Sequence, residues 1–188
     1  MTRECGRNRT SSRQTWPVNL SAQAAADLYE VLRGRGIRCW VMGGWGVDAL
    51  LGAQTREHHD LDVLVLGEDL PLLDEVFRDH GFGVQRVWEA ENRWVEVDGS
   101  TRPTAFVAGT AEGVELDVHV IEVEAGVVVP LCNVPWPFDA GSLEGRGVID
   151  GRPVACVSAQ TQVAMHRGYE LPEAHERDVA LLRQLTDR

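Results

Sequence analysis

Apolar residues recur along this chain with two different periods, and the periods separate expected helices from expected strands. Between residues 21 and 35 they return at the three- and four-residue spacing of one helix face, behind Ser21, a residue type that caps helices. Short apolar runs of strand length stand at 37–42 and 61–66. By the same reasoning we expect strands over 83–89, 93–97, 105–107 and 114–123, and helices over 45–51, 71–80, 158–167 and 172–185.

Glycines mark the ends of these segments. Gly52 and Gly81 follow two of the expected helices, where a left-handed residue ends a helix well. Asp150-Gly151 lies between two apolar stretches of 147–157 and predicts a hairpin turn. The run at 127–131 fits either a strand or a loop.

The order of elements predicts an α+β fold, with a mixed sheet backed by helices and a helical C-terminal section. Residues 1–16 are polar, rich in arginine and aperiodic, so we expect a disordered leader. We expect the core to span 17–157 and the C-terminal helices, packed on it, to span 158–188.

Net charge and composition argue against several classes of function. The net charge of −11 argues against a nucleic-acid groove and against binding to an anionic membrane surface. No apolar run approaches the ~20 residues that span a bilayer, and no secretory signal is visible, so a cytoplasmic protein is expected. The four scattered cysteines predict free, buried thiols. All 18 basic residues are arginine, so any basic contact to a phosphate must come from arginine, histidine or backbone N–H.

The pair Asp60 and Asp62 opens the 61–66 strand region. Residues two apart on a strand point to the same face, so these carboxylates would lie side by side and repel each other. A divalent cation resolves that conflict, and hard oxygen ligands favour Mg²⁺. The alternative is a polar strand end that faces solvent.

Two further segments extend this hypothesis. Gly43-Gly44 follows a strand and precedes a helix, so its backbone N–H groups could approach a phosphate, or it could be a simple turn. In the 114–123 strand Glu115, Asp117 and His119 would share one face, which offers either a third carboxylate for the metals or a solvated strand surface.

Together these segments resemble the minimal nucleotidyltransferase superfamily, which carries a Gly-Gly or Gly-Ser turn, an Asp-x-Asp pair and a later strand carboxylate. The stretch GGWGVDALLGAQTREHHDLDVLV is most similar to antibiotic nucleotidyltransferases of the lincosamide and aminoglycoside-2″ type. The segments ELDVHVI, GVIDGRPVACVS and MHRGYEL resemble later parts of that group. The resemblance runs roughly over residues 37–178 and implies a polymerase-β-like core.

The resemblance also implies roles for individual residues. Asp60 and Asp62 would bind two Mg²⁺ ions, and Asp117 would complete a metal site and accept the proton of the attacking hydroxyl. Gly43 and Gly44 would cradle the triphosphate. Arg56 matches the family's arginine and is either a phosphate contact or part of a structural ion pair. The secondary expectations are a substrate-facing His119, a structural hydrogen-bonding Asp48, a His58 of open role, and His166 and Tyr169 packing a helix rather than touching nucleotide.

The function implied is Mg-dependent transfer of a nucleoside monophosphate, AMP from ATP, to a hydroxyl of a lincosamide- or aminoglycoside-like antibiotic, with release of pyrophosphate. The partners are then a nucleoside triphosphate and a small hydroxylated acceptor, with no nucleic acid and no membrane, and a homodimer is left open. We expect residues 84–110 and 124–145 to shape the acceptor pocket. The alternatives are a toxin–antitoxin nucleotidyltransferase that acts on a protein partner and a catalytically silent nucleotide-binding module.

Overall fold

A mixed eight-stranded sheet forms the centre of the protein. The computed structural model describes residues 19–134, 138–139, 141–166 and 173–186. The strands of the main sheet are β1 (Cys39–Val41), β2 (Asp60–Leu66), β3 (Gly83–Val87), β6 (Ala105–Gly109), β7 (Glu115–Glu124), β8 (Val127–Pro130), β9 (Gly145–Ile149) and β10 (Arg152–Cys156), and β4 (Trp94–Val97) and β5 (Ser100–Pro103) form a separate hairpin. The helices are α1 (Ala22–Gly34), α2 (Gly43–Leu51), α3 (Leu70–His80), α4 (Ala159–Met165) and α5 (Glu173–Thr186), with a 3₁₀ turn over Gly67–Asp69.

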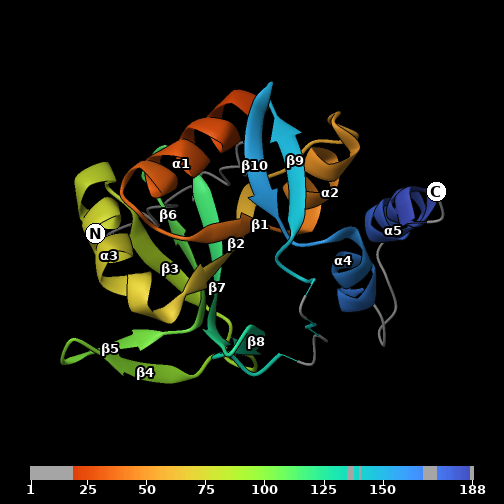
Figure 1. Cartoon of the computed structure of the whole chain (residues 1–188). Coiled ribbons are helices and arrows are strands. Elements are labelled where there is room, and N and C mark those ends of the chain that lie inside the picture. Colours follow the sequence, from red (N-terminus) through yellow and green to blue (C-terminus); the bar gives the residue numbers. More distant parts are fainter. Residues whose placement is uncertain (1–18, 135–137, 140, 167–172, 187–188) are drawn as a thin grey trace, which may run out of the picture.

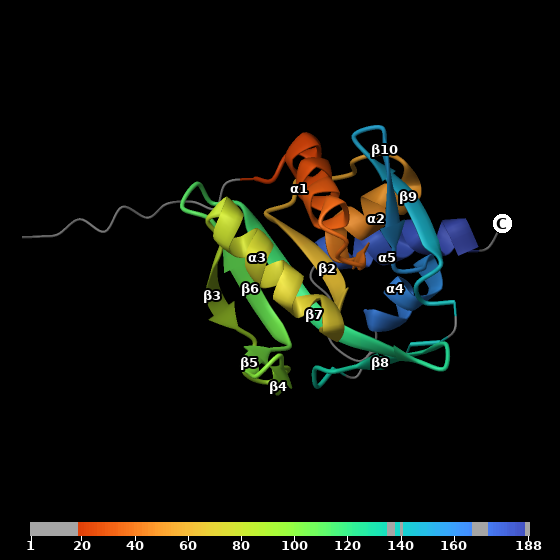
Figure 2. The ribbon, with the colours of Figure 1, turned by 60° about the vertical axis from the view of Figure 1, so that its left-hand side comes forward.

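The strand order in the sheet is β3-β6-β7-β2-β1-β10-β9, and β8 pairs with the outer part of β7. Two neighbouring pairs, β2 with β7 and β1 with β10, run parallel, whereas the other pairs are antiparallel. Helices α1 and α3 lie together over one face of the sheet (Figures 1 and 2). The predicted α+β fold with a mixed sheet is therefore confirmed.

Alternating side chains of the central strands face two different cores. On β2, Leu61, Val63 and Val65 belong to the main core beneath α1 and α3, whereas Leu64 and Leu66 belong to a smaller core on the other face. A fully buried side chain of this size stabilises the fold by about 1.5–3 kcal/mol. Because both faces are covered, β2 is apolar at nearly every position after its two aspartates.

A third apolar cluster joins the C-terminal helices to α2. Val47 of α2 packs with Val163 of α4 and with Val179 and Leu182 of α5. The C-terminal section therefore rests on the helix that begins at Gly43, and α4 and α5 lie beside α2 in Figure 1. The division of the chain at residues 157 and 158 stays a prediction.

The residues predicted to begin and end the helices, and to form the hairpin turn, do so in the structure. The Ser21 hydroxyl accepts a hydrogen bond from Ala24 N at 3.2 Å and caps α1, and Ser158 caps α4 in the same way. Gly52 and Gly81 adopt left-handed conformations behind α2 and α3. At the predicted hairpin turn, Asp150 and Gly151 both have positive φ, as a tight turn between β9 and β10 requires.

Three details differ from the expectations. Helix α2 begins at Gly43 instead of Trp45, so the glycine pair is the first turn of the helix. Strand β5 was not predicted, because its residues are polar and end in Pro103; the preceding Asp98-Gly99, both at positive φ, carried the hairpin signal. The ambiguous run at 127–131 is strand β8, paired with β7.

Other expectations concern thiols, membranes and the leader. Cys39, Cys132 and Cys156 are buried free thiols, as predicted, and Cys5 lies outside the described residues. No helix in the described ranges has the length and apolarity needed to cross a bilayer. The expected leader, residues 1–16, also lies outside the described residues.

A substitution at Gly147 on β9 would test how closely α2 packs on the sheet. A Cβ atom at this position would overlap the backbone carbonyl of Ala49 in α2, and backbone cannot move aside cheaply. We expect Gly147→Ala to destabilise the protein by about 1–3 kcal/mol in chemical denaturation. Gly34→Ala, at the end of α1 where a Cβ has open space, should be neutral or stabilising; equal effects of the two substitutions would contradict the packing.

Candidate active site

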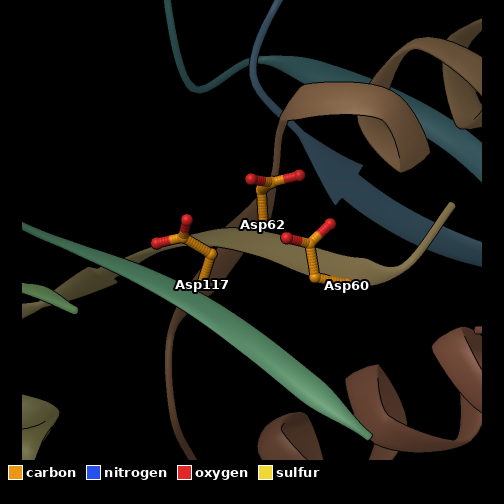
Figure 3. A group of neighbouring side chains, drawn as sticks. All are labelled: Asp60, Asp62 and Asp117. Atoms are coloured by element: carbon orange, nitrogen blue, oxygen red, sulfur yellow. The ribbon is translucent and has the colours of Figure 1, made fainter. Parts of the chain in front are cut away.

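Three aspartates meet where the two central parallel strands begin. The register of β2 and β7 places Asp62 opposite Asp117 and Asp60 opposite Glu115. One carboxylate oxygen from each of Asp60, Asp62 and Asp117 lies within 4.8 Å of the others. Figure 3 shows Asp60 and Asp62 on β2 and Asp117 on β7, with all three carboxylates on the same side of the strands. Glu115 is outside this group of three.

The charges in this cluster are poorly compensated. Burial raises the pKa of Asp62 well above its usual range, and the neighbouring Asp60 and Asp117 raise it further. Burial also raises the pKa of Asp117, partly offset by His119 and by a hydrogen bond from Trp88. A divalent cation would remove this repulsion, and three converging carboxylates are the hard oxygen donors that Mg²⁺ takes. The donor set therefore fits the predicted metal.

The glycine pair lies against this cluster. Gly43 has φ +59°, and a Cβ there would overlap the carboxylate of Asp62, so only glycine fits. A Cβ on Gly44 would overlap the His58 ring and lie 2.7 Å from Arg56 Nη2. The turn thus brings the start of α2 next to the carboxylates on one side and to two basic side chains on the other.

A buried chain of polar contacts supports the glycine turn. Asp48 Oδ2 and His58 Nε2 lie 2.6 Å apart, and both side chains are nearly inaccessible. Arg56 Nη1 is 3.0 Å from His58 Nδ1. A guanidinium has no acceptor, so Nδ1 accepts and Nε2 donates its proton to Asp48. Asp48 also accepts from the backbone and hydroxyl of Thr55, which agrees with the structural role expected for it.

Arg56 also bonds to the C-terminal section. Its Nη2 lies 2.9 Å from Asp178 Oδ2 on α5, and Asp178 is 2% exposed. The structure therefore contains the ion pair that was one of the two alternatives for Arg56. The Arg56 side chain remains 29% exposed and lines the cavity described below, so the phosphate contact stays a prediction.

A different group of side chains surrounds Asp117. Trp88 Nε1 lies 3.1 Å from each carboxylate oxygen of Asp117 and donates to them, and the Arg86 guanidinium stacks over the Trp88 ring at 4.0 Å. His119 Nε2 is 2.9 Å from Glu91 Oε2, and His119 Nδ1 is 3.6 Å from Asp117 Oδ1. His119 thus lies beside the carboxylate expected to accept the proton.

These groups line one cavity of about 360 Å³. It contains every residue of the predicted site: Gly43, Gly44, Arg56, Asp60, Asp62, Asp117 and His119. The expected acceptor segment 84–110 contributes Trp88 and Glu91, whereas no described residue of 124–145 lines the cavity.

Sequence reasoning missed several lining residues. Glu91, Gln162, His175 and Asp178 belong to no motif, and they reach the cavity only through long-range packing; Met165 begins the MHRGYEL segment but was given no role. For Trp88 and Trp94 the sequence favours core packing over an aromatic wall for the acceptor; Trp88 instead lines the cavity and bonds to Asp117, and Trp94 is 62% exposed. His166 lines the cavity, and Tyr169 lies outside the described residues.

Comparison with known proteins agrees with this geometry. The family model for aminoglycoside-2″-adenylyltransferases matches residues 25–182. A lincosamide resistance protein of Staphylococcus haemolyticus is 26% identical over 163 residues, covering 85% of this chain and 91% of that protein. The lincomycin-bound crystal structure of the lincosamide adenylyltransferase LnuA superposes with a TM-score of 0.70 at 21% identity, covering 89% of this chain and 99% of the other. ANT(2″)-Ia in complex with adenylyl-2″-tobramycin gives a TM-score of 0.65 at 23% identity, covering 88% of each chain.

The crowded carboxylates predict an unusual pH dependence of stability. The raised pKa of folded Asp62 means that the metal-free protein takes up a proton on folding at pH values between the unfolded value of 3.8 and the raised folded value. Stability therefore falls as pH rises through that window, and the full cost remains above it. We expect Asp62→Asn to raise the melting temperature of the metal-free protein at pH 8 by about 2–4 °C for each kcal/mol relieved.

Differential scanning calorimetry with EDTA or with Mg²⁺ checks this prediction. Mg²⁺ should raise the melting temperature of the wild-type protein and leave Asp62→Asn nearly unchanged. Asp98→Asn is the matched control, since Asp98 lies in a hairpin turn at positive φ, which asparagine tolerates, and should behave like the wild type. A metal-free Asp62→Asn protein that melts below the wild type at pH 8 would contradict the electrostatic account.

Proposed function

The chain belongs to the aminoglycoside-2″-adenylyltransferase family, and from that premise we propose that it transfers AMP from ATP to a hydroxyl group of a lincosamide- or aminoglycoside-like antibiotic, releasing pyrophosphate. The observation that carries the proposal is the convergence of Asp60, Asp62 and Asp117 beside the Gly43-Gly44 turn. A nucleoside triphosphate with divalent metal needs carboxylates and exposed backbone N–H groups side by side.

The proposed reaction is a displacement at the α-phosphorus. The acceptor oxygen forms a bond to the α-phosphorus, the bond from that phosphorus to the bridging oxygen breaks, and pyrophosphate leaves with the electron pair. Two Mg²⁺ ions, held by Asp60, Asp62 and Asp117, would neutralise the charge on the phosphates. Asp117 accepts the proton of the attacking hydroxyl, since it is the member of the group that faces Trp88 and His119.

Several contacts prepare Asp117 for this role. The Trp88 N–H donates to both of its oxygens and so fixes the orientation of the carboxylate. His119 lies beside it and is itself bonded to Glu91. Such supporting partners of a metal-binding carboxylate commonly change activity by about 10–100-fold when they are removed.

The walls near Asp117 suit an antibiotic acceptor. Trp88 offers an aromatic surface, and the Glu91 side chain is 39% exposed. An acceptor with an amine and a sugar-like hydroxylated face could pack on the indole and pair with the carboxylate. Lincosamides carry one amine and aminoglycosides several, so both fit this description.

The proposal predicts a specific loss of activity on removal of a carboxylate. Asp62→Asn and Asp117→Asn should each lower kcat for nucleotidyl transfer by about 10³-fold or more, because each removes a negative ligand from the metals and Asp117→Asn also removes the proton acceptor. The assay is mass spectrometry of a panel of lincosamides, aminoglycosides and other hydroxylated compounds incubated with ATP and Mg²⁺, in which a product gains one nucleoside monophosphate.

Asp98→Asn serves again as the control and should retain wild-type turnover, since Asp98 lies in a hairpin turn and is not among the residues that line the cavity. Near-normal turnover by Asp62→Asn would overturn the assignment. ATP binding by calorimetry without a modified product for any acceptor would favour the alternative of a silent nucleotide-binding module.

A further inference from the structure

Two histidines from the C-terminal helices line the cavity without a role in the mechanism described above. His166 follows α4 and His175 lies on α5, and their rings meet edge to face with centroids 5.1 Å apart. Both residues line the same cavity as the three aspartates. Ring packing alone would not require either of them to border the cavity.

These histidines belong to a basic cluster next to the glycine turn. Arg56 lies against Gly44. Both Arg56 and His166 are close enough to His175 to lower its pKa. Asp178 has the opposite effect on His175, but its carboxylate is already bound by Arg56, whose Nη2 lies 2.9 Å from Asp178 Oδ2. In a chain with a net charge of −11 and no lysine, Arg56, His166 and His175 lie close together in the lining of the cavity that also contains Asp60, Asp62 and Asp117.

The geometry of the proposed reaction indicates which phosphates would lie near Arg56, His166 and His175. In an in-line displacement the attacking and leaving oxygens lie on opposite sides of the α-phosphorus. The proton acceptor Asp117 and its neighbours Trp88 and Glu91 mark the side of the attacking hydroxyl. Figure 1 places α4 and α5 on one side of β2 and β7 and the β3–β5 segment, which contains Trp88 and Glu91, on the other. The leaving group therefore departs toward α4 and α5.

We propose that His166 and His175, together with Arg56, form the subsite for the leaving pyrophosphate, that is, for the β- and γ-phosphates of the bound nucleotide. The inference rests on the proposed function and deepens it by assigning the C-terminal helices to nucleotide recognition. Asp178 acts as a positioning residue, since its two hydrogen bonds hold the Arg56 guanidinium against the glycine turn.

The state of His175 without nucleotide supports this subsite. Burial lowers the pKa of His175, and the neighbouring His166 and Arg56 lower it further, against the opposing effect of Asp178. Its Nδ1 is buried without a hydrogen-bond partner among the described residues. A polyphosphate would reverse the electrostatic balance and raise the pKa of His175, so binding should be accompanied by proton uptake.

Isothermal titration calorimetry with inorganic pyrophosphate and Mg²⁺ tests the proposal without requiring turnover. We expect His175→Gln and His166→Gln each to raise the Kd of pyrophosphate about ten-fold, the usual cost of one charge-assisted hydrogen bond. The Kd of AMP, which lacks the β- and γ-phosphates, should stay within about two-fold. Repeating the titration at pH 7.5 in buffers of different ionisation enthalpy should show proton uptake by the wild type and less by His175→Gln.

His80→Gln is the matched control, because His80 is exposed at the end of α3 and lies outside the cavity. It should bind pyrophosphate and AMP like the wild type. The two substitutions lie in different elements, His166 at the end of α4 and His175 on α5, so His166→Gln carries the test independently of how well His175→Gln folds. In turnover assays His166→Gln and His175→Gln should each raise KM for ATP more than they lower kcat.

The outcomes separate this inference from the function it rests on. Wild-type affinity for pyrophosphate in both histidine variants, with antibiotic modification intact, would overturn the subsite alone. Equal weakening of AMP and pyrophosphate would show a structural role for the histidines and would also overturn it. A wild-type protein that binds neither ATP nor pyrophosphate with Mg²⁺ would contradict the proposed function itself.

Discussion

The parallel register of β2 and β7 is the constraint on which the rest of the site depends. It places Asp62 directly opposite Asp117, and the two-residue period of the strand brings Asp60 to the same side. A shift of one residue would turn Asp117 into the core and bring Val118 to the site. The apolar side chains of both strands, buried on two faces of the sheet, hold this register in place.

This arrangement concentrates negative charge that the metal-free fold does not neutralise. The fold keeps Asp62 buried at a cost to stability, and Gly43 approaches so closely that no other residue fits beside it. Such a cost is retained where a site must be preorganised for a charged ligand. The buried contact between Asp48 and His58 and the ion pair of Arg56 with Asp178 hold the glycine turn and the C-terminal helices around the three carboxylates.

Local patterns in the sequence account for much of this site. An apolar run predicted β2, the 114–123 run predicted β7, and Gly43-Gly44 was recognised at a strand-to-helix junction. The acidic residues on the two strands led to the metal hypothesis, and all seven proposed site residues do line one cavity. The partners of these residues could not be read in the same way. Asp178 is 122 positions from Arg56, and Glu91 is 28 from His119, so both contacts depend on how helices and loops pack. Trp88 was visible as an aromatic residue, but its hydrogen bond to Asp117 follows only from the three-dimensional placement of the segment after β3.

The central claim is that Asp60, Asp62 and Asp117 together hold divalent metal beside a bound nucleotide. The most direct measurement is a crystal structure with Mn²⁺ and a non-hydrolysable ATP analogue, in which anomalous scattering locates the ions. The account predicts anomalous peaks coordinated by these three carboxylates and by phosphate oxygens of the analogue. A bound analogue with no metal at the three aspartates would contradict it.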